Sequence, residues 1–584
     1  MENDKIRTRL SRREFLRYSA LFATGIVVGG CAPGVAPSPT TAAPTTAPAA
    51  TTAPSAPTSV PAPTSAPTAA PAPTDAPTAT VGPRKGGVLT WGQWDANTSI
   101  DPAVSSGASA TEIIGNVLDP LVAMDGDQRF YPVLASKWEM SSDAKKFTFT
   151  LREGVKFHDG TALTSDAVRR SWQRILDPAT KAAGVVTLFG PVDKLEAPDA
   201  KTVVVTLKEP FPLFLQNLWR PYFGILSPKL LDSLKPGDQV TNLVGTGPFK
   251  FVNRSADGVV TVEANPDYAW GSEILKNRQA PYLQSIKFRS IAEAATRVAT
   301  LESGENLMID ELPEPDYNRL KDDKRFRFVL TPRRSHALGF FINLKNPPTD
   351  DPAVRQAMNW AVDRKTIVEK LFFGIHKVAV GPLSEGVWAR LEDLEKTFGY
   401  DPKKAQQILE DSGWKVGSGG IREKGGKKLS VILATFRSPW TEMAEVAQSQ
   451  FRTVGIDVQI QKMERNAYLD YVRSAKHNLC ASAGTGIDPD ILRVYYQTGV
   501  ASNFSFIADP QVDALLKQGA QQPIGSAERR KTYEDVQRKL MDILPFISIM
   551  SQVRIEATAA KVRDLRMGPE GLNALPMADT WLEG

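Results

Sequence analysis

Residue types that could carry out catalysis are few in this chain of 584 residues, and they are widely spaced. The four histidines, His158, His336, His376 and His477, form no HxH or HxxxH pair, and Cys480 has no CxxC partner. Metal sites of the common tetrahedral kind use closely spaced ligands, so the sequence predicts no metal site. The chain also contains no GxSxG turn and no GxxxxGK phosphate loop. We therefore expect a protein without catalytic residues or a cofactor.

Tryptophans are a second group of interest, because ligand pockets use aromatic side chains as walls. Three of the 11 tryptophans fall on apolar, periodic faces and are expected in the core: Trp138, Trp172 and Trp360. Trp91, Trp94 and Trp440 stand beside turn or loop residues instead. These three are candidates for the wall of a ligand cleft, with packing in the core as the alternative.

The first 31 residues predict export and attachment to a lipid. The sequence SRREFLR at 11–17 resembles the twin-arginine translocation motif, and the uncharged apolar stretch at 18–30 is shorter than the roughly 20 residues that span a bilayer. The sequence VGGC at 28–31 resembles a bacterial lipobox, in which the thiol of Cys31 is acylated. Alternatives are an ordinary secretory signal and an unmodified cysteine. We expect 1–30 to be a signal peptide and Cys31 to anchor the protein at the outer face of the cytoplasmic membrane.

Residues 31–85 are expected to form an unfolded tether. Between 33 and 83 nearly every residue is Pro, Thr, Ala or Ser, and Asp75 is the only charge. This composition buries too little apolar surface to offset the entropy of ordering, and its prolines favour an extended chain.

Removal of 1–30 lowers the formal net charge from +5 to +2. A body so close to neutrality argues against a nucleic-acid partner.

The remainder of the chain predicts alternating strands and helices. Residues 146–152 alternate apolar and polar side chains as a strand does, and a helix is expected from Thr164 or Ser165 to Leu176. Asp-Pro pairs at 351–352 and 401–402 each open a further helix. Residues 429–461 have the pattern of strand, helix and strand, which predicts a parallel strand pair and an α/β lobe.

Five sequence blocks, in order over about 86–560, resemble the extracytoplasmic solute-binding proteins of peptide/nickel-type ABC importers, the family 5 solute-binding proteins. They are LASKW at 134–138 with FTFTLREGVKFHDG at 147–160, VGTGPF at 244–249, FIN at 341–343 with DPAVRQA at 351–357 and AVDR at 361–364, YDPKKA at 400–405, and VGI at 454–456.

The resemblance implies an α/β, two-lobed periplasmic-binding-protein (Venus flytrap) fold in which the chain crosses between the lobes. Lobe I is expected from 86–120, 241–337 and 552–584, an inserted subdomain from 121–240, and lobe II from 338–551. The implied function is to enclose an oligopeptide-like or other polar organic solute between the lobes. The implied partner is the permease and ATPase complex of an ABC importer, and the membrane is contacted only through the lipid anchor.

The same resemblance gives candidate ligand contacts in two stretches of chain. Ser106, Gly107 and Ala108 match an early ligand-facing loop, whose backbone can hydrogen-bond an extended ligand. Trp94 and Trp440 complete the wall that we expect on that side.

The second stretch contains Thr485, Gly486 and Asp488, ahead of Pro489. In the family's peptide binders an aspartate at the position of Thr485 pairs with the ligand's amino terminus, and a tryptophan stands at Ser482. A buried ammonium needs a charged partner, whereas a threonine hydroxyl supplies only a neutral hydrogen bond. Asp488 is an alternative partner, although its place before a proline fits a turn equally well. The sequence predicts a ligand without a free α-amino group here, such as a sugar, a blocked or modified peptide, or another polar solute.

Two functions from other classes stay open on the sequence. One is a secreted hydrolase on a two-lobed scaffold, which lacks a visible pair of nucleophile and base. The other is a structural cell-surface lipoprotein, which lacks visible repeats.

Specificity at Thr485 can be tested directly. We expect di- to pentapeptides with a free amino terminus to bind weakly, and Thr485→Asp to strengthen them, because it restores a charged partner for the ammonium group. Calorimetry of both proteins with a peptide and its N-acetyl form measures the effect. Tight binding of the free amine by the wild type, lost on acetylation, would contradict the prediction.

Overall fold

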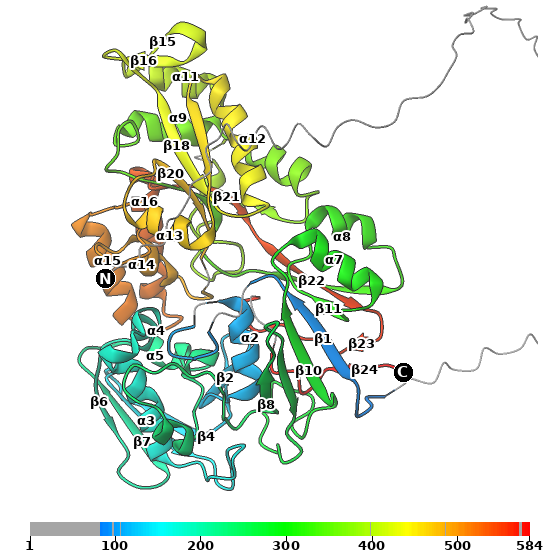
Figure 1. Ribbon diagram of the computed structural model, residues 1–584. Helices are drawn as coiled ribbons and strands as arrows, with labels where there is room; N and C mark the ends of the chain where they lie inside the picture. The colour runs from blue at the N-terminus through cyan, green and yellow to red at the C-terminus, as the bar shows by residue number, and fades with distance from the viewer. Residues whose placement is uncertain (1–81, 96–98, 106, 397–398, 485, 572–574) are drawn as a thin grey trace, which may run out of the picture. The chain divides into compact units, whose positions relative to one another are not determined.

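The computed structural model describes residues 82–584, with gaps at 96–98, 106, 397–398, 485 and 572–574. The expected signal peptide, Cys31 and nearly all of the expected tether lie outside the described residues. Residues 79–584 form one compact unit (Figure 1). Within the described part of the chain, no helix combines the length and the apolar character needed to cross a membrane.

The first sheet is mixed and has seven strands in the order β12-β22-β11-β1-β10-β9-β8. We call this sheet and its helices lobe I. Strand β1 pairs in parallel with β10 and β11, so the carboxyl ends of these strands lie at one edge. The bounds are β1 Val88–Gln93, β8 Phe249–Arg254, β9 Val260–Ala264, β10 Ser285–Ser290, β11 Met308–Ile309, β12 Phe326–Pro332 and β22 Val553–Ala559, with α2 Ala108–Val117, α7 Ala294–Ser303 and α8 Glu314–Leu320.

The second sheet has six strands in the order β14-β21-β13-β20-β18-β19, and with its helices we call it lobe II. Strand β18 is parallel to both β19 and β20. The bounds are β13 Leu338–Ile342, β14 Lys377–Val378, β18 Ser430–Thr435, β19 Asp457–Lys462, β20 Leu479–Ser482 and β21 Phe546–Ser551. The helices are α9 Pro352–Ala361, α11 Pro402–Asp411, α12 Trp440–Thr453, α13 Arg465–Arg473, α14 Ile491–Tyr496, α15 Pro510–Gln521 and α16 Ala527–Ile543.

A third, antiparallel sheet of four strands, β4-β5-β7-β6, belongs to the segment between β1 and β8, which we call the subdomain. Its core is aromatic, and the ring of Trp172 packs edge-on against those of Phe149, Phe189 and Phe214. The bounds are β4 Ala135–Met140, β5 Lys146–Leu151, β6 Val192–Glu196 and β7 Thr202–Leu207, with α3 Ser165–Leu176, α4 Ala183–Phe189 and α5 Leu213–Asn217.

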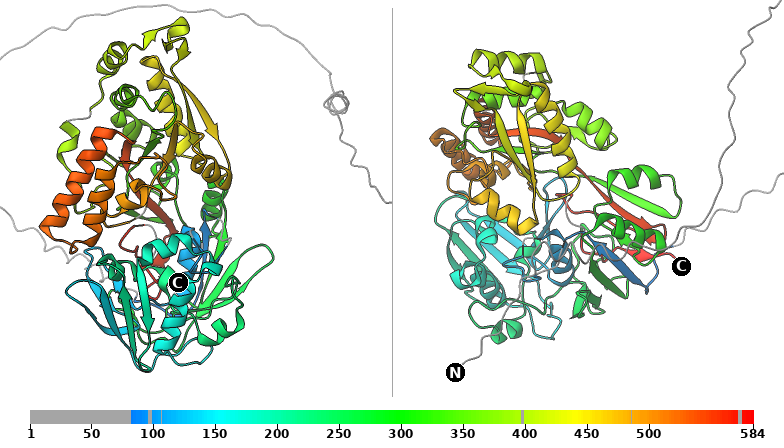
Figure 2. Two further views of the ribbon diagram at one scale, coloured as in Figure 1. Left: turned by 90° about the vertical axis from the view of Figure 1, so that its left-hand side faces the viewer. Right: turned by 45° about the horizontal axis from the view of Figure 1, so that its top comes forward.

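The chain passes between the two large sheets at two adjacent crossings. One is 333–337, between β12 and β13, and the other is Gln552, between β21 and β22. Figures 1 and 2 show the second crossing as the red strands that leave one sheet and enter the other. The backbone N–H of Arg333 donates to the carbonyl of Gln552 at 2.8 Å, so the crossings are bonded to each other.

The elements predicted from sequence periodicity are confirmed. The strand expected over 146–152 is β5, and the helix expected after Thr164 is α3, with the Thr164 hydroxyl accepting from the Ala167 N–H. The pattern at 429–461 is β18, α12 and β19, with Gly455 at a φ of +89° directly after the helix. A residue with a Cβ is strained at this angle, which explains why glycine ends the helix.

Trp91 is not at a cleft wall, and that candidate role was wrong. Its side chain is fully buried on β1, with its ring centroid 5.4 Å from that of Phe288. Alternate residues of a strand point to opposite faces, and Trp91 lies on the face turned to the core. Trp172 is in the core as expected, whereas Trp138 and Trp360 are half-buried and packed against core clusters.

Cys480 lies on β20 and is fully buried. Burial raises the pKa of its thiol to about 12, with a small opposing effect from the Tyr468 hydroxyl. The thiolate is the reactive form of cysteine, so this side chain is chemically inert at neutral pH.

Candidate functional site

Charged and aromatic residues follow directly on the carboxyl ends of parallel strands in both lobes. In lobe I, Trp94 follows β1, and Asp310 and Glu311 follow β11. In lobe II, Arg437 and Trp440 come shortly after β18. Parallel strands present their carboxyl ends at a common edge, which is where ligands bind in many α/β proteins.

The Arg437 guanidinium lies between two indole rings that come from different lobes. Its central carbon is 4.7 Å from the ring centroid of Trp94 and 4.7 Å from that of Trp440. Its Nη1 donates to the carboxylate of Glu311, in lobe I, at 2.7 Å. The structure therefore brings together two of the sequence-predicted cleft residues, Trp94 and Trp440, around an arginine that the prediction missed.

Several buried donors at this point have no acceptor among the described residues. They are the indole Nε1 atoms of Trp94 and Trp440 and the Nε of Arg437. Buried polar atoms nearly always have a hydrogen-bond partner, so such a cluster of donors is unusual in a folded protein.

Beneath this cluster lies a fully buried group of charges centred on Arg554. Its Nε donates to the carboxylate of Glu556, and its Nη2 lies 3.6 Å from Asp310 and 3.9 Å from Glu112. Burial raises the pKa of Asp310 and that of Glu556, and the charge of Arg554 partly opposes both shifts. Three buried acids are thus held around one arginine.

The predicted loop contacts Gly107 and Ala108 lie at the start of α2, where Gly107 is the residue before the first helical turn. The helix is tied to the segment after β1, because the Ser109 hydroxyl accepts from the backbone N–H of Asp95 at 3.3 Å. Glu112 of the same helix contacts Arg554. These contacts connect the start of α2 to the residues around Trp94.

The structure places Asp488, an expected ligand contact, in an ion pair with Arg529. Both carboxylate oxygens accept from the Arg529 guanidinium, at 2.6 and 2.8 Å, and the side chain is buried. A carboxylate already paired in both oxygens has little capacity left for a ligand cation. Gly486 is also buried, and a Cβ built on it would lie 3.1 Å from Ile491. Ser106 and Thr485, like Cys31, lie outside the described residues.

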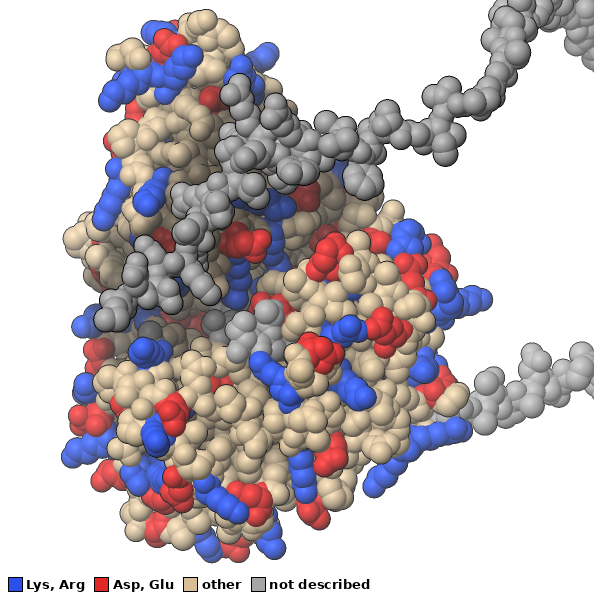
Figure 3. Space-filling model, in the orientation of Figure 1, with Lys and Arg blue, Asp and Glu red and all other residues tan. Residues whose placement is uncertain are grey.

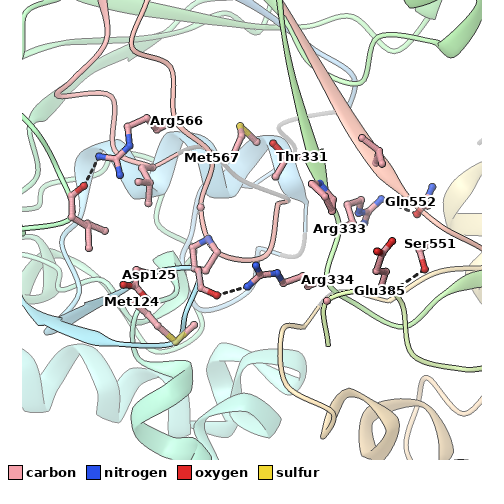
Figure 4. Close-up of a pocket in the computed structure, with 18 of the residues that line it drawn as sticks. Met124, Asp125, Thr331, Arg333, Arg334, Glu385, Ser551, Gln552, Arg566 and Met567 are labelled. Carbon is pink, nitrogen blue, oxygen red and sulfur yellow. Dashed lines mark hydrogen bonds between the residues drawn. The ribbon is translucent and has the colours of Figure 1, made fainter. Parts of the chain in front are cut away.

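A cavity of about 390 Å³ lies beside the crossings (Figure 4). Its lining comes from the crossings, from the subdomain loop at 124–126, from lobe II at 385–386, and from the C-terminal segment at 566–569. Arg333 belongs to the lining, and it also interacts electrostatically with Glu311 and Arg437.

A sequence signal could have found the missed residues. Arg437 and the pair Asp310-Glu311 each follow a run of apolar strand residues without an intervening turn, and the pair Arg333-Arg334 comes directly after β12. Charged residues at the carboxyl ends of buried strands are strong candidates for a ligand site.

No group of three or more histidine, cysteine or acidic side chains in the described residues is placed to hold a metal ion.

The Glu311–Arg437 pair has a testable pH dependence. Burial acts to raise the pKa of Glu311, but Arg437, Arg333 and Arg554 overcome it and lower the pKa from 4.5 to about 2. The stabilisation is therefore complete above pH 4.5 and is lost as the pH falls towards 2. We expect Glu311→Gln to lower the free energy of unfolding by about 3 kcal/mol at pH 7 and by clearly less at pH 3.

Urea unfolding of wild type and variant at both pH values measures this difference. Glu302→Gln is the matched control, because Glu302 pairs with Arg319 at an exposed position where one ion pair contributes little. An equal loss of stability at both pH values for Glu311→Gln would contradict the assignment.

Comparison with known proteins places these features in a family. Residues 129–506 match the model of bacterial extracellular solute-binding proteins, family 5. The glutathione-binding protein GsiB of Pectobacterium atrosepticum is 28% identical over 505 residues, which cover 82% of this chain and 92% of GsiB.

Solved structures agree with the fold. The periplasmic binding protein DppA of Helicobacter pylori, in complex with the peptide STSA, superposes with a TM-score of 0.74 at 24% identity, covering 86% of this chain and 99% of DppA. NikZ of Campylobacter jejuni, in complex with Ni(L-His), gives a TM-score of 0.72 at 26% identity, covering 82% of this chain and 95% of NikZ. The chain belongs to the family 5 extracellular solute-binding proteins, which are binding proteins and not enzymes.

Proposed function

We propose that the protein captures a polar organic solute between its two lobes, at Trp94, Arg437 and Trp440, and delivers it to the permease and ATPase complex of an ABC importer. One observation carries the position of the site: buried donors from both lobes meet there without acceptors in the described residues. Carbonyl, carboxylate or hydroxyl oxygens of a solute would supply those acceptors.

Closure follows from the same arrangement. A solute that accepts from Trp94 of lobe I and from Arg437 of lobe II makes both contacts only when the lobes are together. Such a solute shifts the population towards the closed form, because its affinity for that form is higher. An importer could then distinguish the loaded protein from the empty one.

The hydrolase alternative is disfavoured by the histidines. Each of the four rings is engaged within the protein at 2.7–2.9 Å: His158 with the Gly247 carbonyl, His336 with the Tyr496 hydroxyl, His376 with Glu314, and His477 with the Phe504 carbonyl. Burial lowers the pKa of His336 to about 3 and that of His158 to about 4. A general base needs a pKa nearer the working pH and access to substrate.

Solute capture is testable with a defined panel. The panel contains glutathione, the tetrapeptide STSA and its N-acetyl form, and Ni(L-His), which are ligands of relatives or a close variant of one. A solute present at 100 times its Kd stabilises the folded protein by about 2.7 kcal/mol, which a thermal-shift assay detects. We expect Arg437→Gln to weaken the best binder at least about tenfold, because truncating one side of a buried charged contact is costly.

Arg319→Gln is the control for the panel experiment, since it makes the same change at an exposed position on α8. Equal affinities of wild type and Arg437→Gln would place the site elsewhere. Absence of any shift over a panel widened to sugars and opines would count against solute capture itself.

We further propose that 1–30 is a twin-arginine signal peptide, that Cys31 carries the lipid anchor, and that 31–85 is the tether of the folded body. In that body, lobe I consists of 86–120, 241–337 and 552–584, the inserted subdomain of 121–240, and lobe II of 338–551. The sequence motifs at 11–17 and 28–31 support the first two statements. A long tether would let the folded body search for its importer while it stays at the membrane.

Anchoring gives a separate prediction. Cys31→Ser should abolish lipid labelling and leave uncleaved or released protein, because no thiol remains at the modification site. Metabolic labelling with a fatty-acid analogue measures this, with Cys480→Ser as the control that keeps the label. Unchanged labelling of Cys31→Ser would refute the anchor, and normal export of Arg12→Lys with Arg13→Lys would refute the twin-arginine route.

A further inference from the structure

The cavity beside the crossings is lined by an excess of positive charge. Arg333, Arg334, Lys377 and Arg566 contribute to its lining, as do Asp125 and Glu385. Figure 4 shows Arg333 and Arg334 entering from one stretch of chain and Arg566 on the other side of the space.

The acidic side chains of this cavity already have partners. Asp125 accepts from the Arg129 guanidinium at 3.0 Å and from the Tyr131 hydroxyl at 2.8 Å. Glu385 lies 2.6 Å from the Lys377 ammonium, and Arg566 lies 3.1 Å from Asp579. Arg333 and Arg334 lie within 4 Å of no carboxylate oxygen in the described residues, so neither forms a close ion pair there, and Glu311 attracts Arg333 only at a longer distance.

Arg333 is held in a position that is unfavourable for a cation. Its residue is 9% exposed, its Nη1 donates to Gln552 at 3.2 Å, and its buried Nε has no partner in the described part of the chain. Burial is the main reason that its pKa falls to about 10. The negative charge of Glu311 opposes this shift, and repulsion from Arg437 and Arg554 adds to it. A buried charge of this kind is stabilised by an opposite charge.

Arg334 is fixed where it faces the same space. Its Nη1 donates to the carbonyl of Gly126 in the subdomain. A Cβ built on Gly386 of lobe II would lie 3.3 Å from its Nε, so glycine at that position leaves the side chain its room. A guanidinium has five N–H donors, and most of those of Arg334 remain available.

We propose that this cavity binds a carboxylate of the captured solute, with Arg333 and Arg334 as its partners. This inference rests on the proposed function, because the carboxylate belongs to the captured solute. Arg437 is already paired with Glu311, so it suits an uncharged part of the solute, whereas the guanidinium groups without an ion-pair partner in the described residues lie at the crossings. A guanidinium fork fits the planar geometry of a carboxylate and provides charge-assisted hydrogen bonds, and both arginines line this one cavity.

The first test changes the solute and leaves the protein intact. Glutathione and STSA are compared by calorimetry with forms in which one carboxylate at a time is a primary amide, which keeps the size and removes the charge. We expect one amide of each binder to lose at least about tenfold in affinity. Equal affinities of acid and amides, or preferred binding of neutral solutes such as sugars, would overturn the inference while leaving solute capture intact.

The second test locates the discrimination in the protein. Arg334→Gln, at a half-buried position, is expected to bind the acid and its amide with similar affinity, whereas Arg319→Gln keeps the wild-type preference. Circular dichroism verifies that both variants are folded. Full discrimination in a folded Arg334→Gln would overturn the assignment. Absence of binding by the wild type to every acid in the panel would overturn the proposed function together with the inference.

Discussion

The two large sheets of this protein are joined by two short crossings that are hydrogen-bonded to each other, and the proposed ligand site lies beside this connection. Because the backbone of Arg333 bonds to that of Gln552, the lobes share one narrow junction. The carboxyl ends of β1, β11 and β18 bring their following residues together near it. Any solute in contact with those residues is therefore placed close to the axis about which the lobes would move.

Charged side chains gather near the junction. Glu112, Asp310 and Glu556 surround Arg554, with burial acting to raise the pKa of Asp310 and Glu556. Glu311 and Arg437 form an ion pair between the lobes, and Arg333 and Arg334 form no ion pair within 4 Å in the described residues. On the proposed model, an acidic solute binds here in preference to a basic one, because like charge at a buried site costs several kcal/mol.

Local patterns allowed much of the fold to be predicted, because each depends on neighbours in the sequence. The alternation at 146–152, the Thr164 cap and the Gly455 stop all reappear in β5, α3 and the end of α12. The site was less accessible to such reasoning. Trp94 and Trp440 could be proposed from their turn contexts, whereas Arg437 gained its role only when tertiary packing placed Trp94 beside it. Sequence context alone was misleading for two other residues. The face of β1 on which Trp91 lies places it in the core, and Asp488 pairs with Arg529, which is 41 residues away in the sequence.

The buried thiol of Cys480 has a practical consequence for observing this protein at work. The chain has two cysteines, and a version that starts after Cys31 keeps only this one, whose burial and raised pKa protect it from alkylating reagents. Cysteines introduced on the surfaces of lobe I and lobe II would therefore accept a dye pair selectively. Energy transfer between the dyes would follow the distance between the lobes in single molecules, without first removing a native residue from the folded body.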